Sequence, residues 1–310
     1  MTRTAPSRST LPRSTPIPRT LIGIALMVGA MASLPFIDVM AKFLGQQGIP
    51  VIQIVWARVM FGGLVTLPFA LRHGGPSTLI PARPVYHLFR AGFLIAATFC
   101  FFLSLKFLPI ADAIAIFFVQ PLILTLLSPL VLGETVGRAR WIAVLVGFAG
   151  TLVIIRPGLV EVNPGSFLAL ASGANLAIYF LMTRKISGQA PAMVTTFQTN
   201  LMGALITACI VPFVWVTPTA VQWIMFAGLG TIATFGHFLI VRAYDHAEAS
   251  LLAPIAYTEM IMATILGWWF FGDFPDGWTF VGVGILIACA LYISLSQRGT
   301  ATADADFEQP

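Results

Sequence analysis

Four ionisable side chains stand inside long apolar runs of this chain: Asp38, Arg58, His237 and Glu259. A charged side chain at the centre of a membrane helix costs about 2.5 to 3.5 kcal/mol on insertion scales, so each of them needs a reason. The usual reasons are a partner of opposite charge, a water-filled cavity, or a substrate or ion that the group must bind. These four residues are therefore the first candidates for the protein's chemistry.

Asp38 and Arg58 stand near the same end of two consecutive apolar runs. At the rise of an α-helix, Asp38 lies about 7 Å below the outer end of the first run and Arg58 about 10 Å below the outer start of the second. The two side chains are therefore predicted to form an ion pair. Such a pair could hold the two helices together, or it could act as a gate or as a contact for a substrate carboxylate or phosphate. The sequence leaves both roles open.

Glu259 stands near the middle of the ninth apolar run, and an internal repeat aligns it with Gln120 in the fourth run. Polar groups at matching positions near the membrane midplane are typical of the substrate site in transporters that are built from repeats. A carboxyl group there could also carry a coupling proton. The alternative is a structural glutamate, hydrogen-bonded to backbone at a kink near Pro254.

His237 stands about 7 Å from the inner end of the eighth run, as measured along a helix. A single membrane histidine is more often a packing group than a proton relay, and the sequence leaves both roles open. Asp245 and His246 follow in the next turn, but the spacing has no HExxH-like order that would indicate a zinc site. We therefore expect no metal and no cofactor.

Three aromatic residues, Trp56, Tyr179 and Tyr257, stand deep in their runs and close in sequence to polar residues. Their rings could stack on a planar ligand, or they could serve core packing. Asn200 and its neighbour Gln198 are further candidates to line a cavity, with hydrogen bonding between helices as the alternative.

The elements that carry these residues are membrane spans. The chain is 58% hydrophobic and 9% charged, against about 25% charged in ordinary soluble domains, so it must lie in lipid. Ten apolar runs predict ten transmembrane helices in an all-α integral membrane protein, because barrel strands would be about ten residues long and would alternate in polarity. The runs cover residues 21–43, 51–71, 88–105, 111–132, 140–155, 166–183, 192–214, 221–241, 247–271 and 277–295.

The basic residues predict the orientation of these spans. When the N-terminus is placed in the cytoplasm, most Arg and Lys residues fall inside, and only Lys42, Lys106 and Arg156 fall outside. This bias follows the positive-inside rule, so both termini are expected on the cytoplasmic side of the inner membrane. The net charge of +5 comes from basic residues that stand singly between apolar runs. It therefore does not indicate nucleic-acid binding.

The second half of the chain repeats the first at an offset of roughly 140 residues. Gly133-Glu134 recurs as Gly272-Asp273, and Ala111-Asp112 as Ala247-Glu248. Five spans per half mean that the second half enters the membrane in the opposite sense, which predicts an inverted 5+5 repeat. The expected parts are a cytoplasmic tail at 1–20, a first repeat at 21–158, a second repeat at 165–296 and a cytoplasmic tail at 297–310.

These features resemble the EamA family of the drug/metabolite transporter superfamily. The resemblance rests on the GE and GD turns after the fourth and ninth spans, on Arg58 in the second span, and on the segment from Ala111 to Gly158. It extends over nearly the whole chain after Thr20. It implies a secondary transporter whose ten helices surround a central cavity that opens alternately to either side of the membrane.

The resemblance leaves the substrate open, because members of this family move amino acids, nucleoside-like metabolites, vitamins or toxic compounds, some inward and some outward. The stretch GWWFFGDFPDGWTF at residues 267–280 is most similar to proteobacterial members described as riboflavin transporters. Riboflavin uptake is therefore the specific expectation, and export of amino acids, other metabolites or drugs is its alternative.

Two alternatives come from other classes of protein. A membrane-embedded enzyme would use Glu259, or His237 with the neighbouring Asp245, His246 and Glu248, but no nucleophile arrangement supports it. A membrane scaffold that transports nothing would not require polar groups at the midplane. The chain contains no GxxxxGK[ST] motif, so ATP coupling within it is not expected. The expected partners are the lipid bilayer, a small-molecule substrate and a coupling proton, and the oligomeric state stays open.

Overall fold

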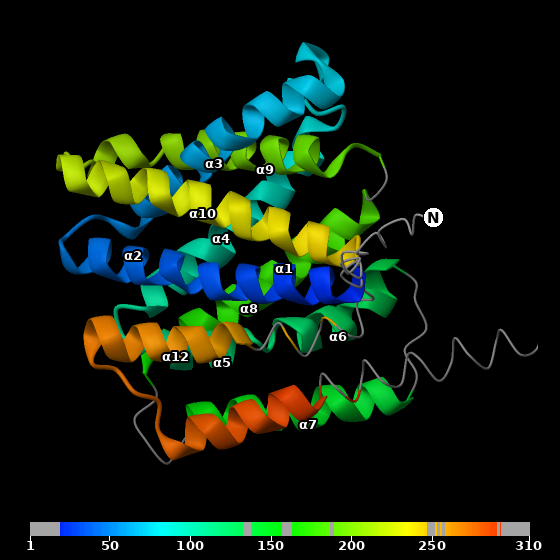
Figure 1. The fold of residues 1–310 in the computed structure, drawn as a ribbon, viewed down its shortest axis with the longest axis vertical. Helices are drawn as coiled ribbons and strands as arrows, with labels where there is room; N and C mark the ends of the chain where they lie inside the picture. Colours follow the sequence, from blue (N-terminus) through cyan, green and yellow to red (C-terminus); the bar gives the residue numbers. More distant parts are fainter. Residues whose placement is uncertain are drawn as a thin grey trace, which may run out of the picture.

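The structure, a computed structural model, describes residues 19–132, 138–156, 163–186, 189–246, 252, 255, 258–289 and 292. Within these residues the regular secondary structure is helical and contains no strand (Figure 1). The helices are α1 (Arg19–Ser33), α2 (Pro35–Gln46), α3 (Val51–Gly74), η1 (Pro76–Leu79), α4 (Pro84–Ser104), α5 (Ile110–Phe117), α6 (Gln120–Leu132), α7 (Arg138–Ile155), α8 (Pro164–Lys185), α9 (Ala192–Ala208), η2 (Val211–Val214), α10 (Ala220–Tyr244), α12 (Thr258–Phe271) and a last helix at Gly277–Cys289.

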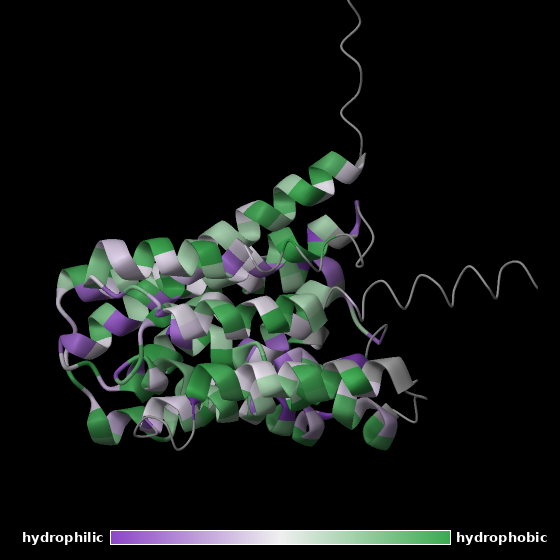
Figure 2. Ribbon diagram, turned by 90° about the horizontal axis from the view of Figure 1, so that it is seen from below, coloured by the Kyte–Doolittle hydropathy of each residue, from purple (hydrophilic) through white to green (hydrophobic). Residues whose placement is uncertain are grey.

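Within the described residues these helices make ten membrane-crossing segments, as the sequence predicts. Helices α1 and α2 combine into one span of 27 residues, and α5 and α6 combine into one of 22 residues. Six spans are long and apolar enough to cross a membrane on length and composition alone. Hydrophobic residues cover most of the helix surfaces in Figure 2. The protein is an all-α membrane protein with five spans in each half.

The helix ends gather on two opposite faces, at the left and right of Figure 1. We call one the arginine face, because Arg72, Arg184 and Arg242 lie in the last turns of helices that end there. We call the other the lysine face, because Lys42 and Lys106 lie near the helix ends that it collects.

Prolines interrupt two of the predicted spans. The first span breaks immediately before Pro35, and the fourth breaks at residues 118–119, just before Pro121. Proline has no backbone N–H, and its ring clashes with the preceding turn, so it favours a break or a kink, although α3 and α6 continue past Pro68 and Pro129. The breaks bring irregular backbone close to Asp38 and Gln120, two of the candidate site residues.

The two repeats pack against each other along their length. Helix α3 packs against α9 and α10, α4 packs against α8, and α1 packs against α10. At one edge of the bundle α7 lies against the last helix, where a Cβ built on Gly150 would be 3.1 Å from the carbonyl oxygen of Gly282. Small residues permit such close helix approach in membranes. The helices that remain in the middle, from both repeats, surround the candidate site.

Candidate functional site

A central cavity of about 270 Å³ lies between the two repeats. Helices α1 to α6 line it from the first repeat, and α8, α10 and α12 line it from the second. Pockets for drug-sized ligands measure about 300 to 1,000 Å³, so this cavity is suited to a small metabolite. Much of its wall is aromatic, with side chains of Phe101, Phe102, Phe117, Phe118, Tyr179 and Phe180.

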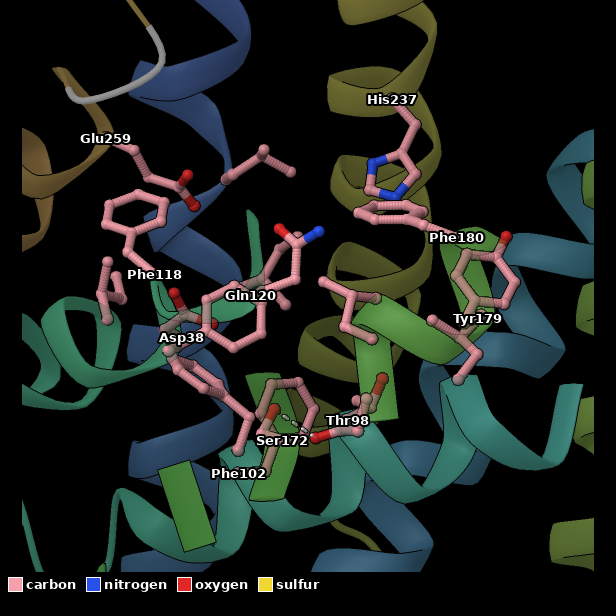
Figure 3. A pocket seen from close by; sticks show the side chains of 18 of the residues that line it. Asp38, Thr98, Phe102, Phe118, Gln120, Ser172, Tyr179, Phe180, His237 and Glu259 are labelled. Atoms are coloured by element: carbon pink, nitrogen blue, oxygen red, sulfur yellow. Dashed lines mark hydrogen bonds between the residues drawn. The ribbon is translucent and has the colours of Figure 1, made fainter. Parts of the chain in front are cut away.

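The polar groups of the cavity are arranged by charge (Figure 3). The carboxylates of Asp38 and Glu259 lie at one side, although they come from α2 in the first repeat and α12 in the second. His237 from α10 and Tyr179 from α8 lie at the other side, and Gln120 lies between the two groups. The structure therefore brings together five of the residues that the sequence analysis selected.

Arg58 also lines the cavity, but the predicted ion pair between Arg58 and Asp38 is not formed in this structure. The guanidinium instead donates a hydrogen bond of 3.2 Å to the hydroxyl of Thr98 on α4. Asp38 is only 8% exposed, and its carboxylate faces the cavity from α2. Side-chain direction explains the difference, since equal depth in two helices brings two groups together only if the helix faces also match. The two charges can therefore act on a ligand separately.

Trp56 does not line this cavity. Its ring packs edge to face against Trp215, with 5.8 Å between the ring centroids, and both line a separate pocket near η2. The side chain of the neighbouring Gln53 is fully buried and holds the backbone of Val216 with two hydrogen bonds, of 2.8 Å and 3.0 Å. The seventh span is also shorter than predicted, because α9 ends at residue 208 and η2 follows. These contacts give Trp56 and Gln53 a packing role in this structure.

Asn200 lies in a smaller side pocket of about 50 Å³ that adjoins the central cavity. Arg58, Tyr179 and His237 line both spaces. Four of the candidate residues therefore lie around this second space. Tyr257, the last candidate, is outside the described residues, as is the Pro254 kink that was the structural alternative for Glu259.

Several residues that the sequence analysis did not select also belong to the site. Thr98 and Ser172 line the central cavity. The Ser172 hydroxyl donates a hydrogen bond of 2.8 Å to the carbonyl oxygen of Ala97. Hydroxyl side chains are common in membrane helices, where they bond to backbone, so the sequence gives no signal for them. Arg90 was counted only as a basic residue of the cytoplasmic side, yet it is fully buried in α4. Its position six residues inside the helix was the available signal.

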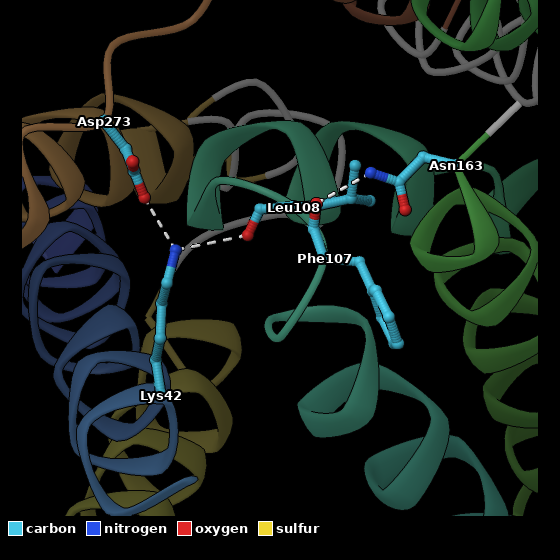
Figure 4. Close-up of polar contacts among 5 residues, drawn as sticks. All are labelled: Lys42, Phe107, Leu108, Asn163 and Asp273. Atoms are coloured by element: carbon cyan, nitrogen blue, oxygen red, sulfur yellow. Dashed lines mark hydrogen bonds and ion pairs between the residues drawn. The ribbon is translucent and has the colours of Figure 1, made fainter. Parts of the chain in front are cut away.

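A contact between the two repeats lies at the lysine face (Figure 4). The Lys42 ammonium on α2 lies 2.6 Å from the carboxylate of Asp273, a residue that follows α12. The same ammonium donates a hydrogen bond of 3.2 Å to the carbonyl oxygen of Leu108. From the second repeat, Asn163 donates 2.8 Å to the carbonyl oxygen of Phe107. Both interactions fix the loop between α4 and α5.

A second, outer pocket of about 400 Å³ lies at the lysine face and is lined by Lys42, Lys106 and Asp273. Phe102 lines both this outer pocket and the central cavity. Its ring, 5% exposed, therefore stands between the two spaces. A short movement of this layer would connect the cavity with the lysine face.

No metal site is present among the described residues, where no three His, Cys, Asp or Glu side chains come close enough together. The carboxylate of Asp245 pairs with Arg242 at 3.1 Å, and His246 Nδ1 lies 2.8 Å from the carbonyl oxygen of Arg242. Glu248 is outside the described residues. Asp245 and His246 thus belong to a helix end at the arginine face.

The two halves of the chain, with a cavity enclosed between them, both match one family model, over residues 21–156 and 163–295. The chain belongs to the EamA-like transporter family. The GE and GD turns and Arg58, on which the sequence resemblance rested, all lie within the matched segments. The family and its named relatives are transporters, so the alternative of a membrane-embedded enzyme falls away.

Three relatives of this EamA-like protein differ in what their names say they carry. It is 25% identical over 278 residues to the S-adenosylmethionine uptake transporter of Rickettsia prowazekii, covering 90% of this chain and 94% of the relative. It is 26% identical over 278 residues to the riboflavin transporter of Vibrio cholerae, covering 88% and 93%. It is 25% identical over 264 residues to the pseudopaline exporter CntI of Pseudomonas aeruginosa, covering 81% and 88%.

A solved crystal structure shares the fold of this EamA-like protein, with a TM-score of 0.63 at 22% identity over 91% of this chain and 98% of the other. The protein is therefore a multi-pass membrane transporter of the drug/metabolite superfamily, whose substrate is a small molecule.

Proposed function

We propose that the protein is a secondary active transporter that takes up a small organic metabolite with a flat ring system, by alternating access across the inner membrane. The observation that carries this proposal is the central cavity. It joins aromatic walls, which suit a planar ring, with polar side chains that the protein itself does not use. No hydrogen bond from a described residue occupies the side chains of Gln120, His237 or Glu259. Buried polar groups are normally paired, so these groups are free to bind a ligand.

Alternating access requires that each face can be closed in turn. In this structure Phe102 borders both the central cavity and the pocket at the lysine face, where Lys42 pairs with Asp273. Because the pair joins the first repeat to the second, a rocking of the repeats would break it. We infer that Lys42 and Asp273 form a latch on the outer side of the transport path.

Glu259 is the proposed site of proton coupling. It faces the cavity from α12, beside Asp38 and opposite His237 (Figure 3). A carboxylate in this position can exchange a proton with the solvent on either side as the cavity opens, and it can bind a cationic group of the substrate when it is ionised. Proton binding and substrate binding at one group are a simple means of coupling.

Two substrates named for relatives fit the cavity's chemistry. Riboflavin, the expectation from the sequence, has a flat ring that aromatic walls can stack on. S-adenosylmethionine has a flat adenine ring and also carries positive charge, which the carboxylates of Asp38 and Glu259 favour. The presence of two acids in the cavity is the specific observation for this second candidate.

The test is uptake by the purified protein in proteoliposomes with an inward proton gradient. Labelled riboflavin, S-adenosylmethionine and tryptophan are supplied outside, and protein-free liposomes are the control. We expect saturable, protein-dependent accumulation of riboflavin or S-adenosylmethionine, and loss of accumulation when an ionophore removes the gradient. Uptake of all three at the rate of the protein-free liposomes would contradict the proposal. Accumulation of tryptophan alone would move the function to the amino acid alternative.

A further inference from the structure

The side pocket next to the central cavity is lined by hydrogen-bond donors. Its described polar residues are Arg58, Tyr179, Thr196, Thr199, Asn200, Thr234 and His237. Each of these side chains can donate a hydrogen bond, and none of the described lining residues is acidic. The two carboxylates of the site, Asp38 and Glu259, line the central cavity and not this pocket. The acids of the site therefore border the central cavity alone, whereas Arg58 borders both spaces.

Two polar side chains of the side pocket, Asn200 and Thr234, lie close to one spot beside Gly62. A Cβ built on Gly62 would lie 3.0 Å from Asn200 Nδ2 and 3.4 Å from Thr234 Oγ1. Gly62 stands one helical turn after Arg58 on α3, so the guanidinium lies over the same face of that helix. Asn200 and Thr234 make no hydrogen bond to another described residue, and Arg58 makes only the bond to Thr98. These donors are free to point at one small ligand group.

A second guanidinium stands behind the wall of this pocket. Arg90 donates a hydrogen bond of 2.5 Å to the hydroxyl of Thr199. The central carbon of its guanidinium lies 5.6 Å from the centre of the Tyr179 ring. Its other partners are the Thr183 hydroxyl, the Thr195 carbonyl oxygen and, at 3.4 Å, His87 Nδ1, and none of them is a carboxylate. Since its positive charge is not neutralised by a described acid, it adds to the positive potential of the pocket.

The size of the pocket fits one anionic group. A cavity needs a volume of about 10 to 15 Å³ to hold a single water molecule. The side pocket has a volume of about 50 Å³. That is room for a group of a few heavy atoms, such as a carboxylate. Arg58 borders both spaces, and a guanidinium matches a carboxylate in shape and charge.

We propose that the side pocket binds the carboxylate of the substrate, and that the transported molecule is a zwitterion whose cationic group faces Asp38 and Glu259. The inference rests on the proposed transport function and narrows its substrate class. The flat ring of the substrate then lies against the phenylalanine walls of the central cavity. Of the two candidates above, S-adenosylmethionine has this chemistry, whereas riboflavin has no carboxylate.

Two matched pairs of ligands test the carboxylate directly. S-adenosylmethionine is compared with its decarboxylated amine, and tryptophan with tryptamine, by titration calorimetry on the purified protein at pH 7. In each pair the only difference is the carboxylate. We expect S-adenosylmethionine to bind about tenfold or more tightly than its amine, as the loss of hydrogen bonds to a charged group predicts. Riboflavin is titrated alongside as a ligand without this group.

Variants of the side pocket connect this preference to its residues. Asn200→Asp keeps the shape of the side chain but places a negative charge among the donors. It should weaken the binding of S-adenosylmethionine about tenfold or more and leave the binding of the amine unchanged or tighter. Thr234→Val removes a donor without adding charge and should give a smaller loss in the same direction. The matched control is Thr207→Val on α9, whose buried hydroxyl bonds only to its own helix and lines neither space. It should keep the native preference.

The outcomes separate this inference from the proposed function. Equal binding of S-adenosylmethionine and its amine, or a preference that survives both pocket variants, would overturn the anion pocket while transport stands. Riboflavin uptake without binding of either zwitterion would overturn the zwitterionic substrate and support the riboflavin candidate. If the pairs show the expected preference but no ligand accumulates in proteoliposomes, the pocket is supported and the transport proposal fails.

Discussion

At the scale of single residues, polar side chains in this protein fall into two groups. Some form hydrogen bonds within the protein. The Gln53 side chain bonds to the backbone of Val216. The Gln222 side chain caps the start of α10 and donates a hydrogen bond of 2.8 Å to Gln47. Others, Gln120, His237 and Glu259 among them, face the central cavity and make no hydrogen bond to a described residue. An unpaired polar group is costly in a low-dielectric interior, so the second group is the one that a ligand is expected to satisfy.

Glu259 gives the sharpest prediction at this scale. Glu259→Gln keeps the size and hydrogen bonding of the side chain but cannot ionise, so the protein should insert and fold normally while proton-driven accumulation is abolished or uncoupled. Transport in proteoliposomes at several pH values is the measurement, and the variant should lose the pH dependence of the native protein. Native rates with an unchanged pH profile would give Glu259 a structural role and direct the search to His237.

At the scale of secondary-structure elements, the described helix ends at the lysine face are held by polar contacts between segments. The Asp276 carboxylate accepts a hydrogen bond of 2.9 Å from the backbone N–H of Thr279. It also forms an ion pair with Arg156, at a distance of 2.5 Å. These hydrogen bonds, the one from the Thr279 backbone above all, hold the pKa of Asp276 below its usual range. The Thr279 hydroxyl also donates a hydrogen bond of 2.9 Å to the Asp112 carboxylate, and this bond joins the last helix to α5. Asp276 therefore fixes a helix start and joins the repeats through Arg156, whereas the pair of Lys42 and Asp273 joins them at α2 and the end of α12.

The latch between Lys42 and Asp273 predicts a change in access to the cavity. A cysteine placed at Thr98, in a variant without the native cysteines, reports access through its rate of labelling by a membrane-impermeant maleimide from the lysine face. Asp273→Asn should raise this rate about fivefold, because a partly exposed ion pair contributes roughly 1 kcal/mol. The exchange of the two charges, Lys42→Asp with Asp273→Lys, should restore slow labelling.

The control for this experiment is Asp276→Asn, which also removes a paired acid at the lysine face but does not touch the latch. Its labelling rate should stay near the native one. Equal acceleration by Asp276→Asn and Asp273→Asn would mean that a general loosening of the face, and not the latch, controls access.

At the scale of the whole molecule, the fold is a bundle in which each repeat supplies part of every wall of the cavity. The carboxylates of Asp38 and Glu259 come from different repeats, and so do Arg58 and Asn200 in the side pocket. A relative movement of the repeats therefore changes the whole site at once. This is the arrangement that alternating access by rigid-body rocking requires.

The orientation of the bundle is testable with reporter fusions that are active in one compartment only. A fusion at Pro310 should report the cytoplasm, because the basic residues collect at the arginine face. A fusion in the connection around Gly158, between the two repeats, should report the opposite compartment, since five spans separate it from the start of the first repeat. The same signal from both fusions would contradict the inverted arrangement in the membrane.

The sequence by itself determined the features that depend on local composition. Insertion into lipid depends on the apolar content of each run, so ten spans could be predicted. Both helix breaks lie beside prolines, at positions 35 and 121, whereas α3 and α6 continue past Pro68 and Pro129. The cost of an ionisable group in lipid likewise singled out Asp38, Arg58, His237 and Glu259, all of which line the central cavity.

Only the tertiary structure decided which side chains meet. Arg58 bonds to Thr98 and not to Asp38, and Trp56 packs on Trp215 away from the cavity. These outcomes depend on the rotation and crossing of each helix, which are set by packing against neighbours from the other repeat and not by the hydropathy of a run. The side pocket of Asn200 and Thr234 has the same origin, because α9 and α10 come together there only when they pack against α3.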